Sequence, residues 1–145
     1  MVSPTTVLAA FGENGYRVTA PRRALAQLIS AREGHFTAED LLDESRRGRL
    51  GLGRATIFRG LDTLTELGLV ERLDLPSGTH AFVACEPSPG HHHHVVCSRC
   101  GHSAPVEDCG MGDVVLEIGR RTGYRVDTHR IELFGICPAC QGSAS

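Results

Sequence analysis

Two pairs of cysteines constrain this chain more than any other feature. Cys97 and Cys100 form one CxxC motif, Cys137 and Cys140 form another, and 36 residues separate the pairs. Two residues between cysteines make a tight turn that directs both thiolates to one side, and two such turns complete the four-thiolate set that structural zinc favours. A redox dithiol or an iron–sulfur cluster is the alternative, but neither accounts for the histidines before Cys97. The sequence therefore predicts a structural zinc site.

A run of four histidines precedes the first of these motifs. His91, His92, His93 and His94 end three residues before Cys97. In a strand, successive side chains point to opposite faces, so His92 and His94 would share one face and His91 and His93 the other. The run could then supply ligands to two different metal sites. A solvated histidine cluster is the alternative for such a tract.

The part of the chain that carries these motifs is small. Residues 91–145 make a unit of about 55 residues, whose own hydrophobic core would be marginal. Structural zinc contributes about 10–16 kcal/mol of apparent binding energy, which is comparable to the stability of a whole domain. We therefore expect the four cysteines to be needed for folding, and a second copy of the chain to cover exposed strand edges and apolar surface.

The first part of the chain has the pattern of a winged helix-turn-helix. Helices are predicted over 19–31, 38–47 and 54–67, because apolar residues recur at helical spacing and Thr37-Ala-Glu-Asp40 resembles a capping signal. Two strands, 69–75 and 79–84, follow and are joined by Pro76-Ser77-Gly78, a plausible hairpin turn. Three helices followed by a hairpin is the order of a winged helix-turn-helix.

A proline-rich segment divides the chain. Glu86-Pro-Ser-Pro-Gly90 predicts a hinge, since its prolines and glycine cannot continue a central strand. The resulting α+β organisation has a winged-helix domain over 1–85, the hinge over 86–90 and a small α/β domain with structural zinc over 91–145. Within the last domain we expect strands and one helix, over 92–97, 103–106, 113–122 (the helix) and 124–136.

Charge is distributed unevenly along the chain. The formal net charge of −2 would normally argue against a nucleic-acid partner, but all 15 basic residues are arginine and two groups of them lie on the predicted helix-turn-helix. Between Glu44 and Asp62 there are five arginines and no acid, namely Arg46, Arg47, Arg49, Arg54 and Arg59. Arg17, Arg22 and Arg23 form a second group. Such clustering favours a duplex-binding face, with a merely solubilising helix surface as the alternative.

Several classes of protein do not fit the sequence. No apolar run approaches the roughly 18–20 residues that span a bilayer, and the segment 1–15 lacks the pattern of a secretory signal. We therefore expect a cytoplasmic protein with no membrane partner. The candidate metal ligands suffice to close their sites and no clear general base accompanies them, so neither an enzyme nor a small organic substrate is expected.

Four segments together resemble the ferric uptake regulator family of bacterial metal-dependent repressors. They are Gly15-Tyr-Arg-Val-Thr-Ala-Pro-Arg22, His35-Phe-Thr-Ala-Glu-Asp-Leu41, Arg54-Ala-Thr-Ile-Phe-Arg59 and His91-His-His-His-Val-Val-Cys-Ser-Arg-Cys-Gly101. Ile131-Glu-Leu-Phe-Gly-Ile-Cys137 supports the resemblance further. It extends over nearly the whole chain and implies a DNA-binding N-terminal domain followed by a metal-binding, dimer-forming C-terminal domain.

The resemblance implies roles for residues on the DNA-binding side. Arg17 matches a basic residue that reaches the minor groove, and Arg22 belongs to the same basic group. Thr56, Phe58 and Arg59 match the recognition-helix segment, in which the family usually has Tyr before Arg. Phe58 keeps the apolar face for a thymine methyl group but lacks the hydroxyl.

The resemblance also implies a sensing site. His92 and His94 match its hinge-region ligands, and Glu71 and Cys85 stand where zinc-sensing members have further ligands. A thiolate in a mixed set of ligands suits Zn²⁺ better than Fe²⁺ or Mn²⁺, so we expect a zinc uptake regulator. An ordinary buried cysteine is the alternative for Cys85. His35 matches a sensing ligand of iron-type relatives and competes with Glu71 for this role.

A second regulatory site is implied for His91, His93 and His129. Relatives complete this site with a glutamate where this chain has Gly112. Asp113 is the preferred substitute, and Glu107 and Asp108 are alternatives. Cys109 has no assigned partner and could be a ligand or have no role.

The function expected from the sequence is that of a zinc-dependent repressor. It would bind palindromic operators of metal-uptake genes as a homodimer when metal-loaded, with double-stranded DNA as its partner and Zn²⁺ as its cofactor. The nearest alternative is an iron-, nickel- or peroxide-sensing member of the same family. A small zinc enzyme or dithiol oxidoreductase comes next, and a zinc-ribbon partner protein that lacks DNA affinity comes third.

Overall fold

The chain folds as two compact units. The computed structural model describes residues 2–86 and 93–142, and the chain divides into unit 1, residues 1–89, and unit 2, residues 90–145. The predicted hinge lies mostly outside the described residues. Within the described part, no helix has both the length and the apolar character needed to cross a membrane.

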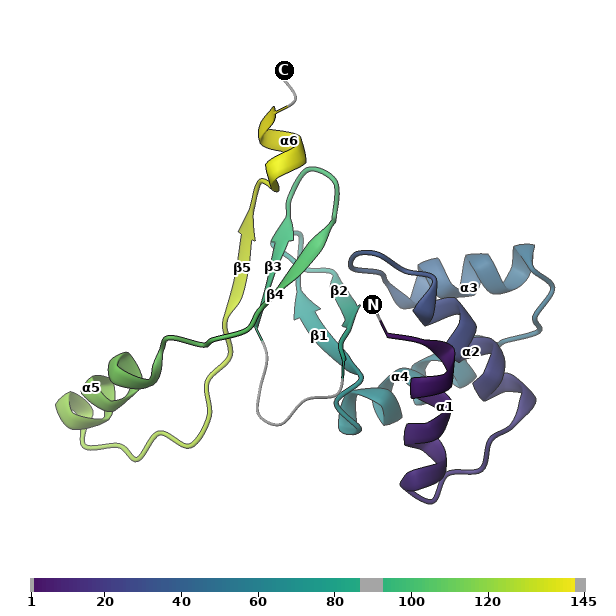
Figure 1. Cartoon of the computed structure of the whole chain (residues 1–145), viewed down its shortest axis with the longest axis horizontal. Helices are drawn as coiled ribbons and strands as arrows, with labels where there is room; N and C mark the ends of the chain where they lie inside the picture. Colours follow the sequence, from purple (N-terminus) through teal and green to yellow (C-terminus); the bar gives the residue numbers. More distant parts are fainter. Residues whose placement is uncertain (1, 87–92, 143–145) are drawn as a thin grey trace. The chain divides into compact units, whose positions relative to one another are not determined.

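Unit 1 combines four helices with a two-stranded antiparallel hairpin (Figure 1). Its elements are α1 (Pro4–Glu13), α2 (Ala20–Ser30), α3 (Ala38–Arg47), α4 (Arg54–Glu66), β1 (Val70–Asp74) and β2 (His80–Ala84).

Polar side chains determine where three of these helices begin. Ser3 and Thr19 each accept a hydrogen bond from a backbone N–H in the first turn of α1 and α2, and a proline follows each cap within the first two helical positions. At α3, the Thr37 hydroxyl accepts the Asp40 N–H at 3.1 Å while the Asp40 carboxylate accepts the Thr37 N–H at 2.9 Å. This reciprocal capping box is the one predicted from the sequence.

The apolar faces of the helices form one core under the hairpin. The fully buried side chains come from every helix of unit 1 and include Phe11, Leu25, Ile29, Leu41, Ile57, Leu61 and Leu64. Phe36 connects the helices to the hairpin, because its backbone exchanges two hydrogen bonds with Phe82 and the two rings stack at 6.2 Å. The core thus fixes α4 against both the other helices and the hairpin.

Unit 2 contains a three-stranded sheet and two helices. Its elements are β3 (His93–Cys97), β4 (Ser103–Val106), α5 (Gly112–Thr122), β5 (Glu132–Gly135) and α6 (Pro138–Gly142). β3 is central, pairing antiparallel with β4 and parallel with β5, in the order β4-β3-β5 (Figure 1). Two extended segments connect α5 to this sheet, and none of the α5 residues is buried in the single chain.

Three differences from the sequence prediction have physical reasons. The strand predicted over 124–136 is wrong for residues 124–131, because only Glu132–Gly135 finds a partner strand. α5 ends at Gly123, which adopts the left-handed φ of 79° and leads into an extended, exposed segment. Helices α1 and α6 were not predicted, and α1 buries Val7 and Phe11 against α2.

Candidate metal centres and nucleic-acid interface

The four paired cysteines converge at one end of the unit 2 sheet. Their Sγ atoms all lie within 4.8 Å of one another, and Cys100 Sγ lies 3.7 Å from Cys137 Sγ. Parallel pairing of Cys97 with Gly135 brings the ends of β3 and β5 together, so the two CxxC turns that follow them face each other. Gly101, at φ 79°, supplies the left-handed residue that closes the first turn.

Backbone donors make this cluster electrostatically suited to a cation. The Cys137 N–H donates to Cys97 Sγ at 3.3 Å and, with the N–H groups of Cys100 and Arg99, lowers the pKa of Cys97 to about 6. The crowded thiols around it, Cys137 first, raise the pKa of Cys140 to about 12. Four thiols this close cannot all ionise unless a cation lies among them, and this donor set suits Zn²⁺.

A buried thiol and a carboxylate meet on the unit 1 hairpin. Cys85 directly follows β2 and is 6% exposed, and its N–H donates to the Leu69 carbonyl at 2.8 Å. Glu71 on β1 offers a carboxylate oxygen within 4.8 Å of Cys85 Sγ. Burial, together with the Glu71 charge, raises the pKa of Cys85 to about 12. The thiol therefore stays protonated at neutral pH until a cation displaces its proton.

The remaining predicted sensing residues lie on separate elements. His94 is buried on β3, whereas His92 lies outside the described residues. His35 precedes Phe36 at the entry to α3 and belongs to none of the groups of three or more potential ligands found in residues 2–86 and 93–142.

A third group of potential ligands forms within unit 2. His93, Cys109 and His129 come together, with their donor atoms within 4.8 Å of one another. Asp113 is exposed in the first turn of α5 and is not a member of this group, and His91 lies outside the described residues. The sequence left Cys109 unassigned because it has no CxxC partner. Its only signal was that it lies shortly before Gly112, the position at which relatives have a glutamate.

The basic residues before α2 have different roles in the structure. Arg17 is exposed, whereas Arg22 is partly buried and donates to the Arg17 carbonyl. The Arg22 guanidinium also lies 5.3 Å from the centroid of the Phe11 ring and 5.4 Å from that of Tyr16. These cation–π contacts hold the α1–α2 connection, so Arg22 has a structural role besides its predicted DNA contact.

The predicted recognition residues lie on one helix. α4 carries Thr56, Phe58 and Arg59, of which Phe58 is 43% exposed and Arg59 is also exposed. Arg54, at the start of α4, forms a bidentate ion pair with Glu39 of α3. This pair fixes the beginning of α4 relative to α3, in addition to the core contacts.

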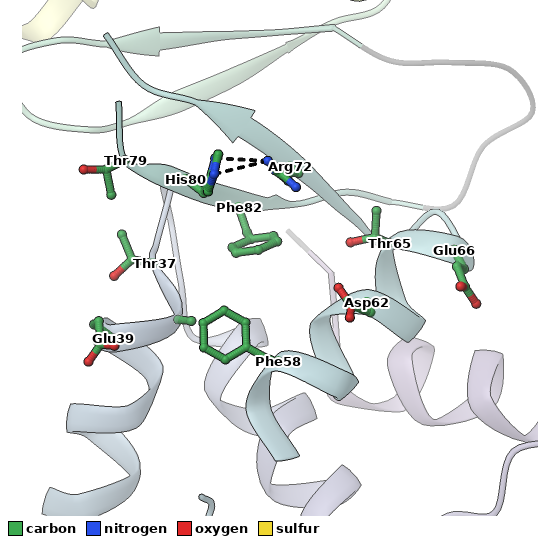
Figure 2. A pocket seen from close by; sticks show the side chains of 11 residues that line it. Thr37, Glu39, Phe58, Asp62, Thr65, Glu66, Arg72, Thr79, His80 and Phe82 are labelled. Atoms are coloured by element: carbon green, nitrogen blue, oxygen red, sulfur yellow. Dashed lines mark hydrogen bonds between the residues drawn. The ribbon is translucent and has the colours of Figure 1, made fainter. Parts of the chain in front are cut away.

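A hollow of about 590 Å³ lies between α4, the start of α3 and the hairpin. Figure 2 shows Phe58 of α4 and Phe82 of β2 projecting into it, with Asp62 on the α4 side and His80 beside Arg72 on the hairpin. Part of the Phe58 ring therefore faces the hairpin, which leaves only part of it available for a base contact.

Comparison with known proteins decides the family. The sequence profile of the Ferric uptake regulator family matches residues 13–134, which extend from the end of α1 into unit 2 and contain all the candidate site residues except Cys137 and Cys140. The chain belongs to the ferric uptake regulator family.

Relatives of this chain include proteins named for the regulation of ferric uptake and of zinc uptake. The chain is 33% identical to a ferric uptake regulation protein of Bacillus subtilis (strain 168), over 89% of this chain and 88% of that protein. It is also 33% identical to a zinc uptake regulation protein of Mycobacterium tuberculosis (strain H37Rv), over 88% of this chain and 96% of that protein. Overall identity therefore does not separate iron from zinc.

A solved member of the family has the same fold along nearly the whole chain. A zinc uptake regulator complexed with zinc and DNA matches with a TM-score of 0.77 and 26% identity, over 97% of each chain. The predicted α+β fold, with a winged helix-turn-helix followed by a small α/β domain, is confirmed by this likeness.

Proposed function

We propose that this ferric uptake regulator family member is a zinc-sensing transcriptional repressor that binds palindromic operators of metal-uptake genes as a homodimer. The family match over residues 13–134 supports the function of a transcriptional repressor. The buried Cys85 thiol beside Glu71 supports zinc as the sensed metal, because a thiolate ligand favours Zn²⁺ over Fe²⁺ or Mn²⁺. The protein would act in the cytoplasm, where its DNA partner lies, and without enzymatic activity.

The proposed sites follow the residues described above. Cys97, Cys100, Cys137 and Cys140 hold structural zinc, and Glu71, Cys85, His92 and His94 hold the sensing ion. A second regulatory site is proposed for His91, His93 and His129, and Asp113 is the acidic ligand that the sequence offers for it. Arg17, Arg22, Thr56, Phe58 and Arg59 contact DNA.

The sensing ligands belong to both units of the chain. Glu71 and Cys85 are on the hairpin of unit 1, whereas His92 and His94 belong to unit 2. Ligands shared in this way favour arrangements of the two units in which all four donors can be satisfied. The ion shifts the equilibrium only by its higher affinity for those arrangements. In a dimer, the arrangement sets the spacing of the two α4 helices and hence of the half-sites that they fit.

DNA binding with and without zinc tests this proposal. A duplex enriched from a random-sequence pool by the zinc-loaded protein would be titrated by fluorescence anisotropy against protein that keeps only its structural zinc. We expect zinc to tighten binding about 5- to 150-fold, the range typical of allosteric coupling. Cys85→Ser should remove most of this effect, whereas His102→Ala, which changes an exposed histidine of unit 2, should keep it. Equal affinity with and without zinc would contradict the proposal.

The same titration separates zinc from the nearest alternative. If Fe²⁺ tightened DNA binding by the protein that keeps only its structural zinc and added Zn²⁺ did not, the chain would be an iron sensor and the argument from Cys85 would be wrong. If no metal tightened DNA binding and the affinity for DNA did not depend on salt concentration, the chain would not be a DNA-binding regulator. Contacts to DNA phosphates always make the affinity depend on salt.

Zinc affinity at the sensing site should rise with pH. Because the pKa of Cys85 is raised to about 12, the thiol is protonated at every pH up to about 9 and must lose its proton when it binds zinc. Apparent affinity should therefore increase about tenfold per pH unit between pH 7.5 and 9, because one proton leaves the thiol for each ion bound. Chelator-competition titrations measure this slope, and Cys85→Ser should flatten it. A flat wild-type profile would mean that the thiol does not bind the ion.

A further inference from the structure

The cluster of His93, Cys109 and His129 gathers three segments that are far apart in the chain. His93 begins β3, Cys109 lies between β4 and α5, and His129 lies between α5 and β5. Cys109 Sγ is 3.2 Å from His93 Nε2 and 3.0 Å from His129 Nε2, and the two Nε2 atoms are 3.2 Å apart. His93 is only 4% exposed, so this convergence occurs at a largely buried point.

Hydrogen bonding alone satisfies such a triangle poorly. Each imidazole nitrogen carries either one hydrogen or one lone pair, so it cannot donate to one neighbour and accept from another. Three mutual contacts among two Nε2 atoms and one sulfur therefore leave at least one contact without its own hydrogen. A cation at the centre would instead use one lone pair from each of the three atoms.

The spacing of the three atoms fits tetrahedral coordination. Zn–N bonds of 2.0–2.1 Å and Zn–S bonds of 2.3 Å place ligand atoms about 3.3 Å apart for two nitrogens and about 3.6 Å for nitrogen and sulfur. The observed separation of 3.2 Å between the two nitrogens is close to the first value, and the nitrogen–sulfur separations of 3.0 and 3.2 Å are about 0.5 Å shorter than the second. One thiolate with two imidazoles is also a donor set that suits Zn²⁺ rather than Fe²⁺ or Mn²⁺.

We propose that Cys109 is a thiolate ligand of a zinc site that it forms with His93 and His129. In this site Cys109 takes the place of the acidic ligand for which Asp113 was proposed, and it compensates for the glycine at position 112. The inference rests on the proposed function, since it identifies the thiolate ligand of the second regulatory site, but its test measures metal binding and does not depend on repression.

This site would act on the position of α5. Cys109 and His129 lie in the two segments that connect α5 to the sheet, and His93 lies in the sheet itself. An ion bound by all three residues would hold both of the segments that flank α5 against β3. The helix, which buries no side chain in the single chain, would thereby gain a fixed position from which to present its apolar residues.

Cobalt spectroscopy tests the thiolate directly. In the full-length Cys85→Ser variant with its structural zinc retained, added Co²⁺ should give thiolate-to-cobalt charge-transfer absorption that saturates at one ion per protomer. Cys85→Ser/Cys109→Ser and Cys85→Ser/His129→Ala should lose this absorption, whereas Cys85→Ser/His102→Ala should keep it. Loss of Cys109 should weaken zinc binding here at least about a hundredfold, because even outer partners of ligands contribute 10–100-fold. Unchanged absorption in the Cys109 variant would overturn the proposal.

Alkylation of the wild-type protein gives a second measurement that needs no variant. Zinc added beyond the structural ion should protect Cys109 from iodoacetamide, as read by peptide mass spectrometry. Equal labelling of Cys109 with and without added zinc would overturn the proposal. Protection of Cys109 in a protein that does not bind DNA would support this site and refute the repressor function, so the two proposals can fail separately.

Discussion

Replacing Cys137 with serine is expected to unfold unit 2 while unit 1 keeps its fold. Unit 2 has few buried apolar side chains among its described residues, chiefly Val96 and Cys97, and α5 contributes none. Structural zinc in a four-cysteine site is worth about 10–16 kcal/mol of apparent binding free energy, more than such a unit can replace by packing. Unit 1 has its own core around Phe11, Ile29 and Leu61, which the substitution does not touch.

Hydrogen exchange resolved by segment measures this effect. In Cys137→Ser we expect amide protection to be lost across β3 and β5, with the zinc content reduced by one ion per protomer and with α2 and α4 still protected. Cys85→Ser is the matched control, since it removes a thiol outside the four-cysteine cluster and should leave β3 and β5 protected. Retained protection of both strands in Cys137→Ser would show that the cluster is not structural.

Placing a carboxylate on the apolar face of α5, with Ile118→Glu, is expected to separate the proposed homodimer into monomers. Ile118 and Val114 lie one turn apart and remain 48% and 46% exposed in the single chain. Other large apolar side chains of unit 2 are exposed as well, namely Val95, Leu116, Tyr124, Val126, Leu133 and Ile136. A single-chain surface with this much exposed apolar area indicates an interface, and a buried unpaired charge would oppose its formation.

Light scattering and DNA titration measure the two consequences of this substitution. The variant should elute as a monomer, and its affinity for the enriched duplex should fall by at least about a hundredfold, because two linked half-site contacts gain 10²–10⁴ over one. Arg120→Glu places the same carboxylate on the opposite side of α5 and should remain dimeric, since the exposed ion pair with Glu117 that it breaks contributes little. If the Ile118→Glu protein remained dimeric, the dimer interface would not include the apolar face of α5.

Local signals determined which parts of the fold could be predicted. α3 was predicted over its full extent, because the Thr37–Asp40 capping box fixes its start and the glycine at position 48 follows its end. The segment 124–131 was misassigned because its apolar residues suggest a strand, whereas pairing depends on a partner that only Glu132–Gly135 reaches. Local sequence contains no information on which strands meet in space.

The same distinction applies to the candidate sites. The four paired cysteines could be grouped from spacing alone, since each CxxC turn directs two thiols to one side. Cys109 could not be grouped, because its neighbours His93 and His129 are 16 and 20 residues away and approach it only through the tertiary fold. Glu71 and Cys85 came from the family resemblance, and the pairing of β1 with β2 gives their proximity a structural basis.

The parallel pairing of β3 with β5 has a consequence for how the chain folds. The partners His94 and Glu132 are separated by the whole of β4 and α5, so their pairing closes a long loop. Closing this loop costs chain entropy before the contacts between the two strands can stabilise it. The thiolates at the ends of these strands allow one ion to close that loop. Unit 1 has no such barrier, because most of its contacts join elements that follow one another along the chain, the two strands of the hairpin above all. The concentration of free zinc should therefore set the rate at which unit 2 of a newly synthesised chain folds, even when unit 1 is already folded.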